Sequence, residues 1–303
     1  MPTPSFHTEL AVPVAGGALT VGVAGPAEPG AAPVVLGLHG TTGSHRSLTA
    51  VARHLAARNI TFLVPDLRGR GASAGLPGPY GLNTHVTDLV AVLDHWGAQR
   101  AVLAGHSLGA WVAARAAAAH PERAAGVVLV DGGLSQRLPG GIDPDAVVDN
   151  VLGAALVRLR MTFASRQHYR DFWRRHPAFA NHWNADIADF VDYDLVGPPG
   201  SLRSRVVEAA VRADGRDVLD ATAAWAALVA VTEPVVLLRA PRGLADEPRP
   251  LIHGKLVDQA KRIVPRMGEV LIGDTNHYLI VFGDREAAVV AGEIVRVTTA
   301  GVA

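Results

Sequence analysis

Short apolar runs, separated by helical patterns, limit the fold of this chain more than any other feature of its sequence. Runs of this kind lie at 33–38, 60–64, 101–104, 126–130, 234–238 and 269–272. A strand that is apolar along its whole length is buried on both faces, which is typical of a parallel sheet. Helical patterns alternate with these runs at 46–58, 84–96, 108–119, 250–262 and 285–297. This alternation predicts an α/β fold in which helices cover both faces of a sheet.

The beginning of the chain adds a different kind of strand pair. Residues 5–13 and 17–24 have strand-like patterns, and a turn at Gly16-Gly17 lies between them. Two such strands with a short glycine turn predict an antiparallel hairpin. The sheet is therefore expected to be mostly, but not wholly, parallel.

The alternating pattern stops between residues 135 and 232, where helical periodicity continues and no convincing strand is found. We interpret 135–232 as a helical cap inserted into a core domain formed by 1–134 and 233–303. Half of the aromatic residues of the chain lie within a stretch of about thirty residues in this segment: Phe163, Tyr169, Phe172, Trp173, Phe179, Trp183, Phe190 and Tyr193. They either build the core of the cap or line an apolar pocket above the sheet. On the second interpretation, Trp173 and Trp183 are candidates for substrate binding.

Charge and composition exclude several classes of function. The chain has 303 residues with 28 basic and 28 acidic side chains, so no net charge favours a nucleic acid or an anionic membrane as partner. Without cysteine it has no disulfide, no thiolate nucleophile and no cysteine-bound metal. The first residues show no signal-peptide pattern, and no apolar run reaches the roughly 18 residues of a membrane helix. We expect a cytoplasmic protein that acts on a small molecule, and a homodimer remains open.

The strongest chemical signal is the segment Gly105-His106-Ser107-Leu108-Gly109, between a predicted strand and a predicted helix. This is the G-x-S-x-G pattern of a nucleophile elbow. Glycines two residues before and after the serine allow the chain to reverse direction without a Cβ clash. The turn presents the serine hydroxyl above the sheet, next to a helix N-terminus that favours negative charge. Ser107 is therefore the candidate nucleophile.

A serine hydroxyl needs a base that removes its proton as it attacks. The base should be a histidine late in the chain, and His277 is expected in a loop just beyond the last strand, at the edge of the sheet where Ser107 also lies. His277 is thus the candidate base. The negative charge that develops on the attacked oxygen needs backbone N–H donors. We assign them to Leu108, which follows the nucleophile, and to Thr41, in the loop after the run 33–38.

Together these motifs resemble those of the α/β-hydrolases. The resemblance covers nearly the whole chain and is carried by His39-Gly40, by the segment 66–73, by the Ser107 turn and by Asn276-His277. It implies an eight-stranded, mostly parallel sheet with an inserted helical cap. It implies no cofactor and no metal ion. In this family the segment 66–73 is usually structural, so we assign it no catalytic role.

The acid that pairs with the base has two candidates. In the commoner pattern of the family it follows the penultimate strand, where Asp246 is the first acid but comes about three residues late. The alternative is Asp131, which directly follows the run 126–130 and precedes two glycines. Some haloalkane dehalogenases and zearalenone-type lactone hydrolases carry their acid at that place. We favour Asp131, which is well placed to reach the far nitrogen of His277.

The resemblance implies a serine hydrolase that cleaves an ester, lactone or thioester of a medium-sized hydrophobic substrate through an acyl-enzyme. In this family, dehalogenases and epoxide hydrolases use a carboxylate at the elbow, so Ser107 argues against those reactions. Two alternatives remain: a hydrolase of carbon–carbon bonds, and a ligand-binding sensor with vestigial hydrolysis. A peroxidase or perhydrolase side activity would use the same site.

Overall fold

An eight-stranded sheet forms the centre of the computed structural model, which describes residues 6–300. Its strand order is β1-β2-β4-β3-β5-β6-β9-β10. The strands are β1 (Thr8–Val14), β2 (Gly17–Ala24), β3 (Val34–Leu38), β4 (Thr61–Pro65), β5 (Ala101–His106), β6 (Ala124–Val130), β9 (Val235–Arg239) and β10 (Gly268–Leu271). β2 pairs antiparallel with β1 and β4, and every other pair is parallel. The predicted hairpin and the predicted eight-stranded, mostly parallel sheet are confirmed.

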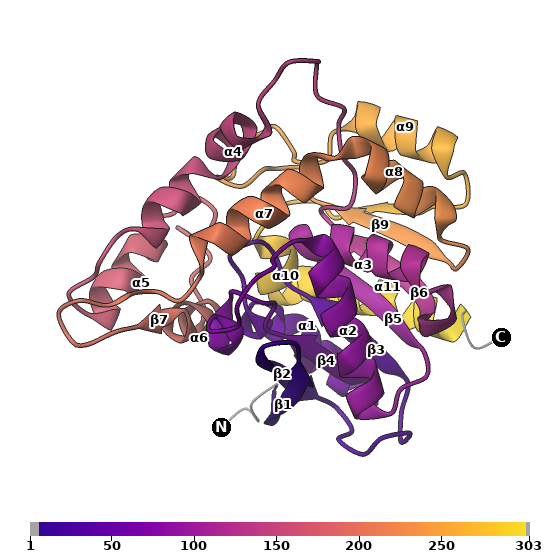
Figure 1. Ribbon diagram of the computed structural model, residues 1–303, viewed down its shortest axis with the longest axis horizontal. Helices are drawn as coiled ribbons and strands as arrows, with labels where there is room; N and C mark the ends of the chain where they lie inside the picture. The colour runs from indigo at the N-terminus through magenta and orange to yellow at the C-terminus, as the bar shows by residue number, and fades with distance from the viewer. Residues whose placement is uncertain (1–5, 301–303) are drawn as a thin grey trace.

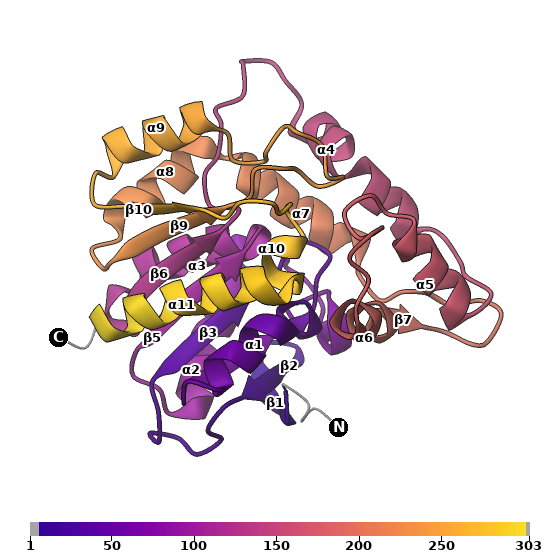
Figure 2. The same ribbon diagram turned by 180° about the vertical axis from the view of Figure 1, so that it is seen from behind.

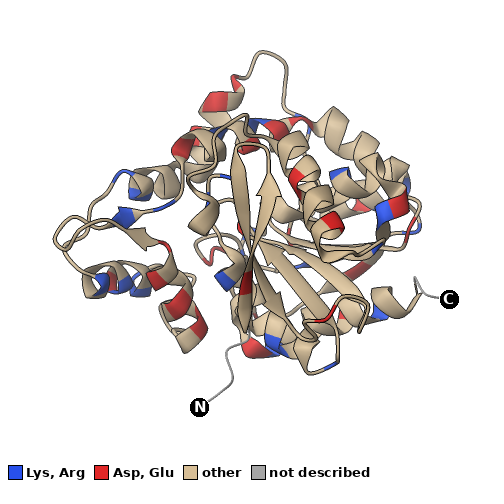
Figure 3. Cartoon of the chain, turned by 60° about the horizontal axis from the view of Figure 1, so that its bottom comes forward, with Lys and Arg blue, Asp and Glu red and all other residues tan. Residues whose placement is uncertain are grey.

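The central strands are buried because their sequences are almost wholly apolar. β3, β4, β5 and β6 carry no charged residue. In Figure 3, charged residues lie mainly on the helices and loops around the sheet. Strands buried on both faces need a covering layer on each side, and the connecting helices provide both layers.

Helices cover the sheet on both faces (Figures 1 and 2). One layer consists of α2 (Leu82–Trp96), α3 (Leu108–Ala119), α8 (Ala221–Ala230) and α9 (Gly254–Ile263). The other consists of α1 (Thr49–Ala56), α10 (Leu279–Phe282) and α11 (Asp284–Ala300). Short 3-10 helices lie at His45–Leu48, Gly71–Ser73 and Pro121–Arg123. Among the described residues, no helix has the length and apolarity needed to span a membrane.

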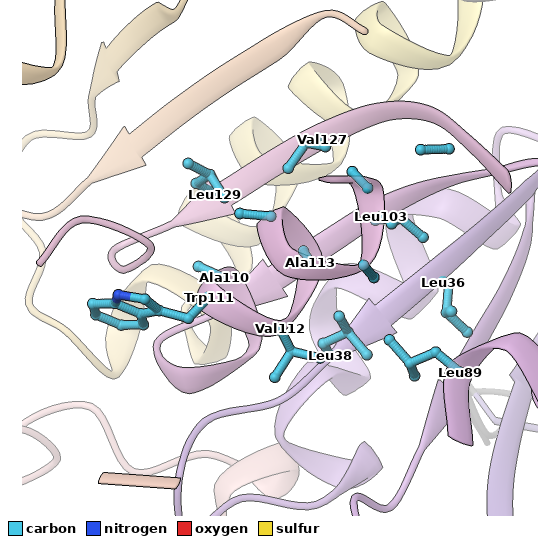
Figure 4. Close-up of a cluster of buried hydrophobic side chains, with 14 of the residues drawn as sticks. Leu36, Leu38, Leu89, Leu103, Ala110, Trp111, Val112, Ala113, Val127 and Leu129 are labelled. Atoms are coloured by element: carbon cyan, nitrogen blue, oxygen red, sulfur yellow. The ribbon is translucent and has the colours of Figure 1, made fainter. Parts of the chain in front are cut away.

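The packing of α3 on the central strands forms the middle of the core. Ala110, Val112 and Ala113 on α3 belong to the same buried cluster as Leu38 and Leu103 (Figure 4). Small side chains on α3 allow the helix axis to approach the sheet closely. This close packing fixes the helix that begins directly after Ser107.

The segment between β6 and β9 contains α4 (Pro144–Leu159), α5 (Arg166–Arg174), α6 (Ala185–Tyr193) and α7 (Glu208–Leu219). It also contains a small antiparallel pair, β7 (Leu195–Val196) with β8 (Arg203–Ser204). The expectation that this segment has no strand was wrong at this point. Each of these strands has two residues, which is too short for a periodic pattern to reveal.

One helix of this segment belongs to the layers of the sheet. α8 lies within the range 135–232 that we predicted as the cap, yet its Ala224 and Leu228 are buried in the main core cluster with residues of α3. Figure 1 shows α8 beside α3, whereas α4, α5 and α6 extend away from the sheet. The helical periodicity of α8 resembles that of α4, α5 and α6, so the sequence did not show that α8 belongs to the core.

Buried polar contacts attach the inserted helices to the core. The carboxylate of Asp66 accepts hydrogen bonds from the Tyr193 hydroxyl on α6 (2.7 Å) and from Nδ1 of His45 (2.9 Å). Burial alone would raise the pKa of Asp66, but the charge and hydrogen bonds of His45 lower it to about 2. Asp66 therefore stays ionised and holds both elements.

The position of α8 leads to a stability prediction. Leu228 has no exposed surface and Val229, the next residue, is 54% exposed. We expect Leu228→Ala to lower the free energy of unfolding by about 2–5 kcal/mol, because it leaves a cavity under the helix. The control Val229→Ala should change it by no more than about 0.5 kcal/mol. Urea unfolding curves measure both, and equal effects would contradict the assignment of α8 to the core.

Candidate active site

The turn between β5 and α3 places Ser107 at the carboxyl edge of the sheet. Ser107 has a positive φ of 53° with a ψ of −125°, a conformation that is costly for a residue with a side chain. The neighbouring glycines make it attainable. A Cβ on Gly105 would lie 2.0 Å from the carbonyl oxygen of Gly109, and one on Gly109 would lie 2.2 Å from that of Leu38. Only glycine fits at either position.

His277 and Asp131 come together from loops that are far apart in the sequence. Nδ1 of His277, in the loop after β10, lies 2.7 Å from Oδ2 of Asp131 at the tip of β6. The other carboxylate oxygen of Asp131 accepts the Ala240 N–H at 3.1 Å. Both side chains are buried. Asp131 can thereby fix the orientation of the imidazole and stabilise its cation.

Asp246, the alternative acid, has other partners. Its Oδ1 accepts a hydrogen bond from Nδ2 of Asn276 (2.9 Å) and forms an ion pair with Arg242, whose Nε lies 2.8 Å away. Asn276 in turn accepts the N–H groups of Tyr278 and Leu279 at its Oδ1. Asp246 thus supports the loop that carries His277, whereas Asp131 contacts the imidazole itself.

Ser107 and His277 face the same space. Both residues line two cavities that lie next to each other above the carboxyl edge of the sheet. In the part of the chain that the structure describes, the Ser107 hydroxyl makes no hydrogen bond with His277. Such contacts are often longer in a ligand-free site and tighten when a substrate binds.

The turn after β3 approaches Ser107 from the other side. The turn is closed by a hydrogen bond of 2.9 Å from the Gly43 N–H to the Gly40 carbonyl. A Cβ on Gly40 would lie 3.2 Å from Cβ of Ser107. Thr41 lines both cavities, and Leu108, the first residue of α3, lines one. An N–H at that helix position has no partner within the helix.

Two buried histidines, His39 and His106, hold this arrangement together, although no sequence pattern predicted a role for either side chain. Nε2 of His106 donates to the His277 carbonyl at 2.8 Å, and burial lowers its pKa to about 3. Nδ1 of His39 donates to the Gly40 carbonyl (2.8 Å), and its Nε2 accepts the Leu67 N–H (3.0 Å). Burial lowers the pKa of His39 to about 4. Both rings are therefore neutral at pH 7, and their hydrogen bonds hold the neighbouring loops in place.

The inner cavity has a volume of about 100 Å³ and a mostly aliphatic wall. Its floor consists of Thr41, Ser107, Leu108, Trp111 and His277. The inserted helices supply its roof, with α4 giving Val147, Val148, Val151 and Leu152, and α7 giving Gly215, Val218 and Leu219. Leu244 and Leu251 complete the wall. The second cavity, of about 60 Å³, lies toward α6 and α10 and includes Phe190, Tyr278 and Phe282.

A larger outer cavity continues from the inner one. Its volume is about 550 Å³, and it shares six residues with the inner cavity: Trp111, Val151, Val218, Leu219, Leu244 and Leu251. Its further lining is more polar and includes Asn150, Glu247, Arg249 and His253. A narrow apolar space beside Ser107 thus widens into a chamber of mixed character.

The prediction that Trp173 and Trp183 bind the substrate is not supported by their positions. Neither residue lines any of these three cavities. Trp173 is buried among the aromatic rings of the inserted helices, and the Arg174 guanidinium lies over the ring of Trp183. Both rings pack in or against a buried cluster that the inserted helices share with the core domain, including Phe282 of α10. Trp111 and Phe190 are the aromatic residues that reach the cavities from α3 and α6.

No group of three or more histidine and acidic side chains in residues 6–300 is arranged to hold a metal ion. The side chains around Ser107 that carry chemistry are a hydroxyl, an imidazole and a carboxylate. That set is sufficient for acyl transfer without any added group.

The fold and this arrangement define an α/β-hydrolase. The sequence model of the alpha/beta hydrolase fold matches residues 33–284. The chain therefore belongs to the α/β-hydrolase family, as its motifs predicted.

Characterised relatives match the chain over shorter stretches. Lipase LipV of Mycobacterium tuberculosis is 38% identical over 110 residues, which are 36% of this chain and 39% of the lipase. Epoxide hydrolase A of the same species is 39% identical over 125 residues, 41% of this chain and 38% of that protein. The matched parts thus span about two-fifths of these relatives.

Solved structures match over nearly the whole length. E-2-(acetamidomethylene)succinate hydrolase superposes with a TM-score of 0.75 at 21% identity, covering 95% of this chain and 99% of that one. A thioesterase domain from the curacin biosynthetic pathway gives 0.74 at 22% identity, with 95% and 98% covered. At these identities the likeness shows the fold alone.

Proposed function

We propose that this protein is a serine hydrolase that cleaves a carboxylic ester, lactone or thioester with an aliphatic acyl group. The observation that carries the proposal is the convergence of Ser107 and the His277–Asp131 pair on an apolar cavity. A hydroxyl next to a base whose other nitrogen is held by a carboxylate is the arrangement needed for nucleophilic attack on a carbonyl.

The reaction begins with attack of Ser107 Oγ on the carbonyl carbon. Nε2 of His277 takes the hydroxyl proton, and Asp131 stabilises the resulting imidazolium through Nδ1. The N–H groups of Thr41 and Leu108 bind the oxyanion, and the N-terminus of α3 adds a favourable dipole. His277 then returns its proton to the leaving alcohol, hydroxyl or thiol, and the acyl group remains on Ser107.

Water then hydrolyses the acyl-enzyme, again with His277 as the base. His277 removes a proton from the water molecule as its oxygen attacks the acyl carbon, and the same N–H groups bind the second oxyanion. The bond to Ser107 Oγ breaks, and His277 protonates the serine. The carboxylic acid and the free enzyme result, without any cofactor.

The residue at the elbow favours acyl transfer over epoxide opening. The relatives by sequence include a protein named a lipase and proteins named epoxide hydrolases, so their names do not separate the two reactions. In this chain the elbow carries Ser107, where the family resemblance leads us to expect a carboxylate for epoxide chemistry.

The shape of the cavities indicates the acyl group. A cavity of about 150 Å³ lined by apolar side chains holds one benzene molecule, and the inner cavity measures about 100 Å³. A linear aliphatic chain fits this space better than an aromatic ring next to the carbonyl. Longer chains can continue past Val151 and Leu219 into the outer cavity.

The first prediction tests the nucleophile. The wild-type protein should hydrolyse p-nitrophenyl butyrate and should be labelled at Ser107 by a fluorophosphonate. Ser107→Ala should lose about five to six orders of magnitude in kcat, because the nucleophile is gone, while its melting temperature stays the same. Retained hydrolysis in Ser107→Ala would refute the mechanism. Tight binding of an ester by the wild-type protein without turnover would favour a sensor instead.

The second prediction separates the two candidate acids. Asp131→Asn should lower kcat by about four orders of magnitude, because the imidazole loses the carboxylate that orients it and stabilises its cation. Asp246→Asn should lower kcat by less than about tenfold, because Asp246 contacts the loop and not the ring. Steady-state kinetics on the same ester measure both variants. The reverse order of effects would assign the acid to Asp246.

The third prediction tests the path of the acyl chain with two substitutions on α4. Val151 is 48% exposed and lines both the inner and the outer cavity, whereas Val157 is 61% exposed and lines neither. Val151→Phe should narrow the junction, so kcat/KM should fall at least about tenfold for an octanoate ester and change less than about twofold for acetate. Val157→Phe should affect neither ester. An equal loss for both esters in Val151→Phe would contradict this path.

A further inference from the structure

A fully buried ion pair connects the inserted segment to the core at a place that the mechanism above does not use. Nη1 of Arg70 lies 2.6 Å from Oδ2 of Asp214, and neither side chain has any exposed surface. Arg70 belongs to the loop after β4, and Asp214 lies in the middle of α7. A buried charge that loses its partner is strongly destabilising. Separation of Arg70 from Asp214 is therefore costly, and the contact fixes the position of both side chains.

The same guanidinium also holds the turn that faces Ser107. Nε of Arg70 donates to the carbonyl of Thr41 at 2.9 Å, and its Nη1 donates to the carbonyl of Arg68 at 3.0 Å. Thr41 is the residue whose N–H we assigned to the oxyanion. The Thr41 N–H lies in one peptide plane with the Gly40 carbonyl, which accepts hydrogen bonds from Nδ1 of His39 and from the Gly43 N–H. Arg70 holds the next peptide plane through the Thr41 carbonyl, so the planes on both sides of the Thr41 Cα are restrained.

Asp214 is held from a second side. Its carboxylate lies 3.1 Å from Nε2 of His85, a buried residue of α2. Burial alone would raise the pKa of Asp214, but the charge of Arg70 and the contacts with His85 lower it below its usual range. The carboxylate therefore remains charged between two elements of the core while its own helix belongs to the inserted segment.

The helix that carries Asp214 is also part of the cavity wall. Gly215, the next residue, and Val218 line the inner cavity beside Ser107. Asp214 and Arg70 thus connect α7, which forms part of the cavity wall, to the Thr41 turn, whose N–H we assigned to the oxyanion.

We propose that Asp214 is a positioning residue, through which α7 holds Arg70 and thereby keeps the Thr41 turn in place for the oxyanion. The inserted segment then completes the oxyanion hole as well as roofing the cavity. The inference rests on the proposed hydrolase function and adds that a residue without contact to the substrate controls transition-state binding.

The test compares Asp214→Asn with Asp217→Asn. Asp217 lies on the same helix and accepts the Leu82 N–H at 2.8 Å, so it anchors α7 to α2 without contacting Arg70. For p-nitrophenyl butyrate, Asp214→Asn should lower kcat at least about tenfold with KM changed less than about twofold, because the loss is confined to the transition state. Asp217→Asn should leave both parameters within about twofold.

A second measurement reads the oxyanion hole directly. An alkylboronic acid forms a tetrahedral adduct with a serine hydroxyl, and one of its oxygens takes the place of the oxyanion. Its inhibition constant should rise in Asp214→Asn by about the same factor by which kcat/KM falls. A purely structural role would instead lower the melting temperature and leave kcat and the boronate affinity as in Asp217→Asn, and this would overturn the inference.

Arg70→Lys is measured in parallel and decides the matter if Asp214→Asn does not fold. It keeps a positive charge beside Asp214 but cannot supply the fork of donors that also reaches Thr41. The expected loss of kcat and of boronate affinity is the same, and unchanged values would overturn the inference. If the wild-type protein neither hydrolyses esters nor binds the boronate, the proposed function itself fails, which is a distinguishable result.

Discussion

The backbone turn at Ser107 is the constraint on which the rest of the site depends. The conformation of Ser107 is unfavourable, and it persists because β5 and α3 hold both ends of the turn. Gly105 and Gly109 admit no side chain, because backbone carbonyl oxygens lie where a Cβ would be. The close packing of α3 on the central strands therefore does more than stabilise the fold. It fixes the one place at which a hydroxyl, the N–H of Leu108 and the base from the far end of the chain can meet.

Local patterns were sufficient to predict the sheet, its covering helices and the turn at Ser107. The apolar runs and the glycine spacing are properties of neighbouring residues, and the structure has each of these elements where the pattern placed it. The pairing of His277 with an acid depends instead on two loops separated by 146 residues. Sequence spacing left Asp131 and Asp246 as alternatives, and the geometry brings Asp131 to the imidazole.

Positions that depend on tertiary packing could not be derived from the sequence. An aromatic ring on a helix has the same pattern whether it lines a cavity or fills a core, so the sequence left both interpretations of Trp173 and Trp183 open. The same holds for α8, whose buried Leu228 packs on the sheet although its periodicity resembles that of its neighbours. The pairing of Arg70 with Asp214 carried no signal, because a buried ion pair between distant segments has no local pattern.

The floor and the roof of the inner cavity are held by different kinds of contact. Buried hydrogen bonds of His39, His106 and Asp131 fix the floor. The helix α4 of the roof packs on α7 through a small buried apolar cluster that includes Val148, Leu156 and Val211. Ion pairs at the surface add to this contact: Arg160–Glu208, Arg212–Asp149 and Arg216–Asp145. Such pairs contribute about 0–1 kcal/mol each and are screened by salt. The apolar cluster under α4 is much smaller than the core beneath Ser107. A bulky ligand would therefore displace α4 before it displaces the floor, so that the packing of α4 on α7, and not only cavity volume, limits the largest molecule that the site can admit.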